Sequence, residues 1–241
     1  IGHALGLPHP SHDRQPNLLS ESENQHRWTL MSSFGSDGFD SRTLTLSQLD
    51  IAALQYLYGV NKNTRAGDDT YLFDETEPNF VWDGAGNDTI DAASATESVT
   101  IFLKAGYHGF KGPVKNELIT VAGQITVNFG TEIENLIGSN FNDRLTGNEL
   151  NNLITGGVGS DSIDGAEGTD TAAYTVNFDE ASLSNFVDYG SSGGTIQLGT
   201  AWNVVSGNET DTLRNIERLK FNDKYIALDL DGNAGNIVKL L

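Results

Sequence analysis

Cysteine is absent from the 241 residues, so the chain has neither disulfide bonds nor thiolate metal ligands. Basic residues are also scarce: 14 Lys and Arg stand against 33 Asp and Glu, which gives a formal charge of -19. This excess of negative charge argues against nucleic acids and anionic membranes as partners. No apolar run is long enough to span a bilayer, and no signal peptide opens the sequence. We therefore expect bound divalent cations to relieve the charge and to stabilise the fold in place of disulfides.

Glycine, asparagine and aspartate recur with a nine-residue period over residues 138–173. The four copies read GSNFNDRLT, GNELNNLIT, GGVGSDSID and GAEGTDTAA. The sixth position holds Asp143, Asn152, Asp161 and Asp170, and the eighth position holds Leu145, Ile154, Ile163 and Ala172. The glycine column provides the backbone freedom that a tight turn needs. The period predicts a six-residue turn and then a very short strand, in which the residue at position eight faces inward.

Two such repeats make one coil of a flattened solenoid, so alternate repeats stack on the same edge. This places Asp143 beside Asp161, where two carboxylates and several turn carbonyls converge and would repel each other without a cation. Calcium suits such a cage because it takes many oxygen ligands in loose geometry. The opposite edge pairs Asn152 with Asp170, and its lower charge predicts weaker binding. The alternative is a glycine-rich polar loop with a chance period.

A separate copy of the repeat, DGAGNDTID, stands upstream of an insertion. Asp88 occupies its sixth position and Ile90 its eighth. We expect it to pair with the segment TRAGDDTYLF, where Arg65, Gly67 and Asp69 could offer oxygen ligands from the preceding coil.

The chain opens IGHALGLPHP, in which His3, Gly6 and His9 have the spacing of the last two histidines in H-E-x-x-H-x-x-G-x-x-H. In that motif imidazoles bind zinc, and zinc acidifies a water for attack on a peptide carbonyl. Ile1 and Gly2 fill the two positions between the first and second histidines. We therefore expect the first histidine and the glutamate general base to precede Ile1, so that no catalytic residue lies in this chain. Ordinary loop histidines are the alternative.

Met31 is the sole methionine and stands in WTLMSSF, at a distance that matches the methionine turn beneath the zinc of metzincin proteases. In this interpretation it forms a hydrophobic floor; an ordinary buried methionine is the alternative.

The following segment, LSQLDIAALQYLYG, predicts a helix with Ser47 as N-cap, Asp50 three residues later and a stop at Gly59. Ile51, Leu54 and Tyr58 recur at helical spacing and predict its packing face.

Five motifs in order, GHALGLPHP, TLMSSF, LDIAALQYLYGVN, TRAGDDTY and WDGAGNDTID, resemble the serralysin family of secreted zinc metalloendopeptidases. The resemblance covers roughly residues 1–173. It implies that His3 and His9 are zinc ligands and that Met31 is the turn methionine. It also implies a set of calcium-site residues: Arg65, Gly67, Asp69, Asp83, Ala85, Gly86, Asp88, Glu134, Gly138, Asp143, Gly156, Gly157, Gly159, Asp161, Gly165, Gly168 and Asp170.

One position departs from the family. Ser33 stands where members commonly carry a tyrosine that can reach the transition state. Serine is too short for that reach, so oxyanion stabilisation would come from zinc or another group.

The resemblance implies three parts. Residues 1–63 are the C-terminal part of an α+β metzincin catalytic domain, and residues 64–173 form an all-β parallel β-roll with an insertion. Residues 174–241 form a strand-rich closing segment and a linker to a missing C-terminal region. Within it, Leu213, Ile216, Leu219 and Phe221 could cap the solenoid.

The function implied is that of a calcium-stabilised zinc endopeptidase with Zn²⁺ and Ca²⁺ as cofactors, protein or peptide as substrate and a monomeric state. It would be extracellular, after bacterial type I export. A calcium-dependent adhesion or scaffold module with a degenerate protease domain is the alternative. A repeat-containing carbohydrate enzyme is weaker, because no paired-carboxylate site can be told apart from calcium ligands.

Overall fold

The computed structural model describes residues 2–10, 19–32, 46–192 and 195–228, with the backbone alone over residues 185–192 and 195–200. Ser33 and the end of the chain from residue 229 lie outside the described residues. In the part of the chain that is described, no helix is both long and apolar enough to cross a membrane.

A short 3-10 helix (His3–Leu5) and α1 (Gln48–Tyr58) precede a long series of strands. The strands of the first half are β1 (Thr70–Leu72), β2 (Asn79–Val81), β3 (Thr89–Asp91), β4 (Val99–Phe102), β5 (His108–Lys111), β6 (Gln124–Val127), β7 (Asn135–Ile137) and β8 (Arg144–Thr146). Those of the second half are β9 (Leu153–Thr155), β10 (Ser162–Asp164), β11 (Thr171–Ala173), β12 (Ala181–Ser192), β13 (Thr195–Ser206), β14 (Glu209–Arg214), β15 (Arg218–Lys220) and β16 (Tyr225–Ala227). A second 3-10 helix (Phe178–Glu180) precedes β12.

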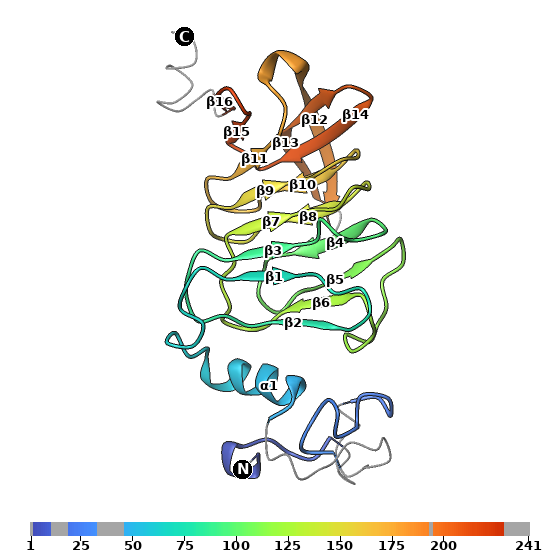
Figure 1. Ribbon diagram of the computed structural model, residues 1–241, viewed down its shortest axis with the longest axis vertical. Helices are drawn as coiled ribbons and strands as arrows, with labels where there is room; N and C mark the ends of the chain where they lie inside the picture. The colour runs from blue at the N-terminus through green and yellow to red at the C-terminus, as the bar shows by residue number, and fades with distance from the viewer. Residues whose placement is uncertain (1, 11–18, 33–45, 193–194, 229–241) are drawn as a thin grey trace.

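These strands form two sheets, and the strands of each sheet follow one another along the long axis of the molecule (Figure 1). One sheet has the order β1-β3-β7-β9-β11-β15-β16, and the other has the order β12-β13-β14-β10-β8-β4-β5-β6-β2. From β7 to β11 successive strands alternate between the two sheets, and same-sheet neighbours are parallel. The parallel β-roll predicted from the nine-residue period is therefore confirmed.

The register of the strands follows the period of the sequence. Leu145 pairs with Ile163 in one sheet, and Ile154 pairs with Ala172 in the other. Each pair is separated by two nine-residue repeats, so one coil consists of two repeats, as the sequence indicates. The upstream copy behaves in the same way, because Tyr71 of β1 pairs with Ile90 of β3 in parallel.

The core is a double column of side chains between the two sheets, each at most 1% exposed. One sheet contributes Ile90, Leu136, Ile154, Ala172 and Leu219, and the other contributes Ile101, Leu145, Ile163 and Leu213. Strands of three residues have only one inward position each, so each of them contributes a single side chain to the core.

We expect Leu136→Ala to lower the free energy of unfolding by about 2–5 kcal/mol, because it leaves a cavity in a column that no neighbour can fill. The measurement is urea unfolding at saturating calcium. Leu72→Ala is the matched control: Leu72 lies on β1 but is 71% exposed, so its loss should change stability little. Equal losses in the two variants would contradict the single-column core.

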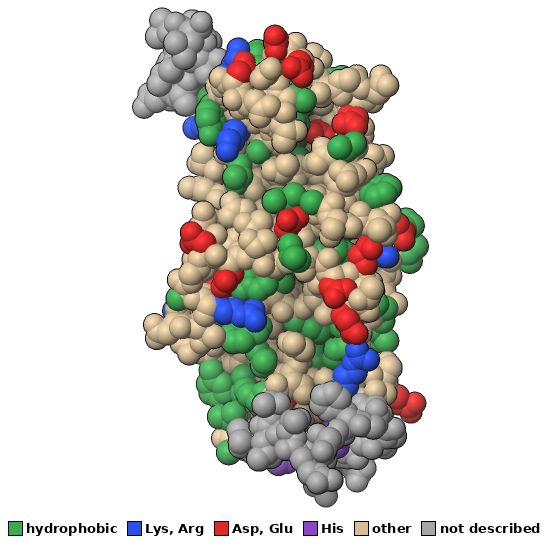
Figure 2. Space-filling view, viewed as in Figure 1, with side chains coloured by type: hydrophobic (Ala, Val, Ile, Leu, Met, Phe, Trp, Pro, Cys, Tyr) green, Lys and Arg blue, Asp and Glu red, His purple; other side chains and the backbone are tan. Residues whose placement is uncertain are grey.

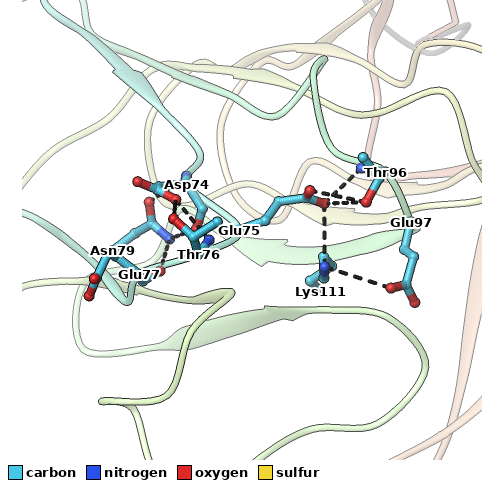
Figure 3. Close-up of polar contacts among 8 residues, drawn as sticks. All are labelled: Asp74, Glu75, Thr76, Glu77, Asn79, Thr96, Glu97 and Lys111. Atoms are coloured by element: carbon cyan, nitrogen blue, oxygen red, sulfur yellow. Dashed lines mark hydrogen bonds and ion pairs between the residues drawn. The ribbon is translucent and has the colours of Figure 1, made fainter.

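The insertion between β3 and β7 adds β4, β5 and β6 to the second sheet, and polar contacts connect it to the first coil (Figure 3). Glu75 accepts the backbone N–H of Thr96 at 2.7 Å and lies 3.6 Å from Lys111 Nζ on β5. Lys111 also contacts Glu97, at 3.7 Å. The insertion is thus part of the roll and not a separate lobe.

Stacking continues beyond residue 173. Strand β14 pairs in parallel with β10, and β15 pairs in parallel with β11, with Ile163 opposite Leu213 and Ala172 opposite Leu219. The long β12–β13 hairpin joins the same sheet through β14, in the upper part of Figure 1. Leu213, Ile216, Leu219 and Phe221 are all buried, so they extend the core into the closing segment.

Helix α1 lies at the opposite end of the roll, between the strands and the N-terminal segment (Figure 1). Its capping agrees with the sequence: Asp50 accepts the Ser47 N–H at 2.9 Å, and Gly59 ends the helix with a φ of 81°. The predicted packing face is wrong at Tyr58, which is 69% exposed. The Tyr58 hydroxyl donates to the Leu5 carbonyl at 3.0 Å. Helical spacing alone could not predict this contact, because Leu5 lies outside the helix.

Candidate metal centres

The two N-terminal histidines meet. His3 lies on the 3-10 helix, Gly6 turns the chain with a φ of 85°, and His9 returns so that the two Nε2 atoms are 3.1 Å apart. Two Nε2 ligands of one tetrahedral zinc, each about 2.0–2.1 Å from the metal, lie about 3.3 Å apart. The pair therefore fits two corners of a zinc site.

The second nitrogen of His9 fixes the orientation of its ring. His9 Nδ1 lies 2.7 Å from the carbonyl oxygen of Met31. A carbonyl only accepts hydrogen bonds, so Nδ1 carries the proton and the neutral ring presents an unprotonated Nε2. This is the tautomer that a metal requires, with the backbone carbonyl as outer support.

Met31 forms a floor beneath this segment. Its side chain is 6% exposed, and a Cβ atom built on Gly2 would lie 2.2 Å from Met31 Sδ. The preceding residues are held by α1, since Asp50 accepts the Thr29 hydroxyl at 2.7 Å and the Leu30 N–H at 2.8 Å. The buried Asp50 thus caps its own helix and also anchors the turn that carries Met31.

A first acidic cluster lies where the upstream repeat meets its partner segment. Carboxylate oxygens of Asp69, Asp83 and Asp88 lie within 4.8 Å of one another. A Cβ atom built on Gly86 would lie 2.3 Å from the Gly67 carbonyl oxygen and 2.6 Å from Asp88 Oδ1, so that carbonyl faces the cluster as well. The donors are all oxygens, which is the set that calcium prefers.

Residues beside this cluster hold its segments in place. Arg65 has a φ of 49°, and its carbonyl accepts the Ala85 N–H at 3.4 Å. Its guanidinium lies over the rings of Tyr71 and Trp82. Asp83 is held by the Tyr71 hydroxyl at 2.5 Å.

The position-six residues form a hydrogen-bonded ladder along each edge of the roll. On one edge the Asp143 N–H donates to Asp161 Oδ1 at 2.8 Å, and on the other the Asn152 N–H donates to Asp170 Oδ1 at 2.7 Å. The Asp88 N–H donates to Glu134 Oε2 at 2.8 Å in the same way. Each of these bonds joins the backbone of one residue to the side chain of the residue at the same place in the next coil, so Asp143 and Asp161 are neighbours on one edge.

The glycines allow the turns to stack closely. A Cβ atom on Gly138 would lie 2.2 Å from the Gly156 carbonyl oxygen, and one on Gly157 would lie 2.0 Å from that of Ser139. Gly159 and Gly168 approach the Phe141 and Leu150 carbonyls in the same manner. Any larger residue would push the carbonyls of adjacent coils apart, and with them the oxygens that converge on each edge.

Three of these buried carboxylates have only one of their two oxygens hydrogen-bonded. Among the described residues, Asp88 Oδ2, Asp161 Oδ2 and Asp170 Oδ2 have no hydrogen-bond partner. Burial raises the pKa of Asp88 to about 6 and raises those of Asp161 and Asp170 to about 7. It also raises the pKa of Asp143. A cation at each edge would supply the missing partner for these oxygens.

The ladders also include two residues that the sequence analysis did not identify. The Asp161 N–H donates to Asp211 Oδ1, and the Asp170 N–H donates to Glu217 Oε2, both at 2.8 Å. A signal for Glu217 was present: IERL at 216–219 repeats the pattern of IENL at 133–136. Asp211 had none, because the β12–β13 hairpin separates it from the repeats.

Comparison with known proteins agrees with this geometry. The RTX calcium-binding nonapeptide repeat matches residues 66–94 and 137–172. Serralysin C of Dickeya chrysanthemi is 32% identical over 60% of this chain and 34% of its own length. Metallopeptidase AprA of Pseudomonas marginalis is 36% identical over 59% of this chain and 35% of its own length. Serralysin of Proteus mirabilis is 34% identical over 59% of this chain and 33% of its own length.

This chain thus spans about a third of the length of the curated relatives it matches. The calcium-binding repeats and the relatives together support Ca²⁺ and Zn²⁺ as the two cofactors, as the sequence predicted.

Proposed function

Because this chain belongs to the serralysin family, we propose that it forms the calcium-binding part and two zinc ligands of a secreted zinc metalloendopeptidase. The observation that carries the proposal is the histidine pair, with its Nε2 atoms 3.1 Å apart and the Met31 carbonyl fixing the ring of His9. The substrate class is protein or peptide, and the location is extracellular. The three-part division at residues 63 and 173 is retained as part of this proposal.

In this function His3 and His9 hold the metal, and the Met31 turn holds His9. When bound, zinc supplies a Lewis acid that acidifies water and polarises a peptide carbonyl. Hydrolysis also needs a general base, and no histidine of this chain is followed by the glutamate of the motif. The chain alone is therefore expected to bind zinc without cleaving peptides.

Zinc binding tests the first part of the proposal. We expect one zinc per chain, measured with a chromophoric zinc indicator, with an affinity that His3→Ala weakens at least about tenfold. His26→Ala is the control, since His26 instead contacts the Ser32 carbonyl. If His3→Ala and His26→Ala bound zinc as tightly as the unmodified chain, these would be ordinary loop histidines.

Peptide hydrolysis tests the second part. With added zinc and calcium, this chain is expected to leave casein intact. Casein cleavage that disappears in His3→Ala would overturn that expectation and place a base within these residues.

The roll would act as the stabilising part of the enzyme. The carboxylates along each edge repel one another without cations, so we propose that the folded roll is only marginally stable without calcium and is strongly stabilised where calcium is abundant, as in extracellular fluid. Acidic side chains are spread along the face shown in Figure 2, with basic side chains interspersed among them. A calcium titration followed by circular dichroism should show a cooperative gain of strand signal. A flat response would refute the coupling of calcium binding to folding.

A further inference from the structure

The last coil of the roll contains no nonapeptide turn, yet it places the same kinds of oxygen at the same points. In the preceding coil six residues, Gly165–Asp170, lead from β10 to β11. In the last coil only Asn215, Ile216 and Glu217 lead from β14 to β15. The Asp170 N–H donates to Glu217 as the Asn152 N–H donates to Asp170. The longer glutamate side chain thus takes the position-six place across a shorter turn.

The carbonyl oxygen of Asn215 lies where the repeats place the carbonyl oxygen of a glycine. A Cβ atom built on Gly165 would lie 2.1 Å from the Asn215 carbonyl oxygen and 2.5 Å from Asp170 Oδ2. The corresponding point above Gly138 lies 2.2 Å from the Gly156 carbonyl oxygen and 2.7 Å from Asp143 Oδ2. The same pair of oxygens therefore converges at the end of the roll and inside it.

Glu217 also repeats the contacts of Glu134. Each accepts, through Oε2 and at 2.8 Å, the N–H of the aspartate one coil earlier, Asp170 or Asp88. Each follows a buried isoleucine and stands two residues before a fully buried leucine. The two Ile-Glu-x-Leu segments thus make the same glutamate contact, one before the repeats and one after them.

Asp170 is the observation that points to a ligand. The residue is 0% exposed, and its Oδ2 has no hydrogen-bond partner among the described residues. The charged groups that act on it, Glu217 and Asp164, are both acidic. Asn215 directs its side-chain amide to Asp164 Oδ1 at 2.7 Å and leaves its carbonyl towards Asp170. A buried carboxylate oxygen without a hydrogen-bond partner therefore lies near the Asn215 carbonyl oxygen, and the ionisable side chains that act on it carry the same negative charge.

We propose that Asp170 Oδ2, the Asn215 carbonyl and the Glu217 carboxylate bind a further calcium ion at the end of the roll, with water completing its coordination. The site lies partly outside residues 137–172 and uses two residues that the nonapeptide pattern does not contain. Calcium fits better than magnesium, because an uneven set of carbonyl and carboxylate oxygens does not form a strict octahedron. The proposal rests on the calcium-binding function of the roll.

Glu217→Gln tests the site, because glutamine can still accept the Asp170 N–H but has lost the charge. Calcium bound per chain is measured by equilibrium dialysis. We expect one ion fewer, or one class of sites weakened at least tenfold, with the strand signal at saturating calcium unchanged. Glu167→Gln is the matched control, since it removes one charge from the exposed face of the adjacent turn.

Identical binding by Glu217→Gln and Glu167→Gln would overturn the site and leave the proposed function intact. Absence of any calcium binding by the unmodified chain would overturn both. If Glu217→Gln fails to fold, a crystal structure of the unmodified chain with calcium decides. An ion about 2.3–2.6 Å from Asp170 Oδ2 and the Asn215 carbonyl supports the site, and density for water or nothing there overturns it.

Discussion

Asp161→Asn should stabilise the calcium-free chain and weaken its calcium binding, two effects of opposite sign from one substitution. Asp161 is 2% exposed, and its Oδ2 has no hydrogen-bond partner among the described residues. Without a cation its negative charge therefore destabilises the folded chain, and removing it should raise the free energy of unfolding by about 1–3 kcal/mol. In the calcium-bound state that we propose, the same charge would bind the ion, so its loss should reduce calcium affinity at least tenfold, since the number of charged ligands tunes calcium affinity.

The chain itself shows that asparagine fits this place. Asn152 occupies position six on the other edge, and its amide donates to the Ile133 and Glu134 carbonyls at 3.3 and 3.2 Å. An asparagine at 161 can still accept the Asp143 N–H through its oxygen, as Asp161 does now. The new variant should therefore keep the stacking of the turns and change the charge alone.

The measurements are thermal unfolding without calcium and calcium affinity by isothermal titration. A gain of about 1 kcal/mol corresponds to roughly 2–4 °C in Tm for a chain of this size. Asp179→Asn, at an exposed aspartate, is the control and should change neither quantity. A lower Tm for Asp161→Asn than for the unmodified chain, both without calcium, would show that the Asp161 carboxylate does not destabilise the calcium-free fold.

The calcium-free chain should also be more stable near pH 5 than near pH 7.5. In the folded chain burial raises the pKa of Asp88 to about 6 and those of Asp161 and Asp170 to about 7, against about 3.9 for an unfolded aspartate. Below about pH 4 both states are protonated and the burial costs nothing. As the pH rises from 4 to 7, the unfolded chain releases these protons first, so folding becomes progressively less favourable.

Calcium should reverse this order, because its carboxylate ligands must be ionised to bind it. At saturating calcium we expect a higher Tm at pH 7.5 than at pH 5. Circular dichroism at the two pH values, with and without calcium, gives the four Tm values needed. Asp161→Asn should reduce the pH dependence of the calcium-free chain, since it removes one of the raised groups. A calcium-free Tm that increases steadily from pH 5 to pH 7.5 would contradict the prediction.

The features that the sequence predicted well are those repeated at short range. The nine-residue period specified which side chains face inward and which coils stack, so that the pairing of Leu145 with Ile163 and the contact of Asp143 with Asp161 follow from it. The ends of α1 could also be predicted, because Ser47, Asp50 and Gly59 cap the helix through contacts within one turn of their own positions. The spacing of His3 and His9 across Gly6 was also sufficient to bring the two rings together.

The sequence by itself thus determined the roll, the rows of carboxylate and amide side chains along its edges and the histidine pair, since each depends on a fixed number of residues between chemically equivalent positions. Only the tertiary structure decided that Asp211 and Glu217 continue the ladders, because the β12–β13 hairpin interrupts the period before the chain rejoins both sheets. It also decided that the Met31 carbonyl sets the tautomer of His9 and that Tyr58 lies exposed. These partners are far apart in sequence, and their contacts depend on how whole coils and segments pack against one another.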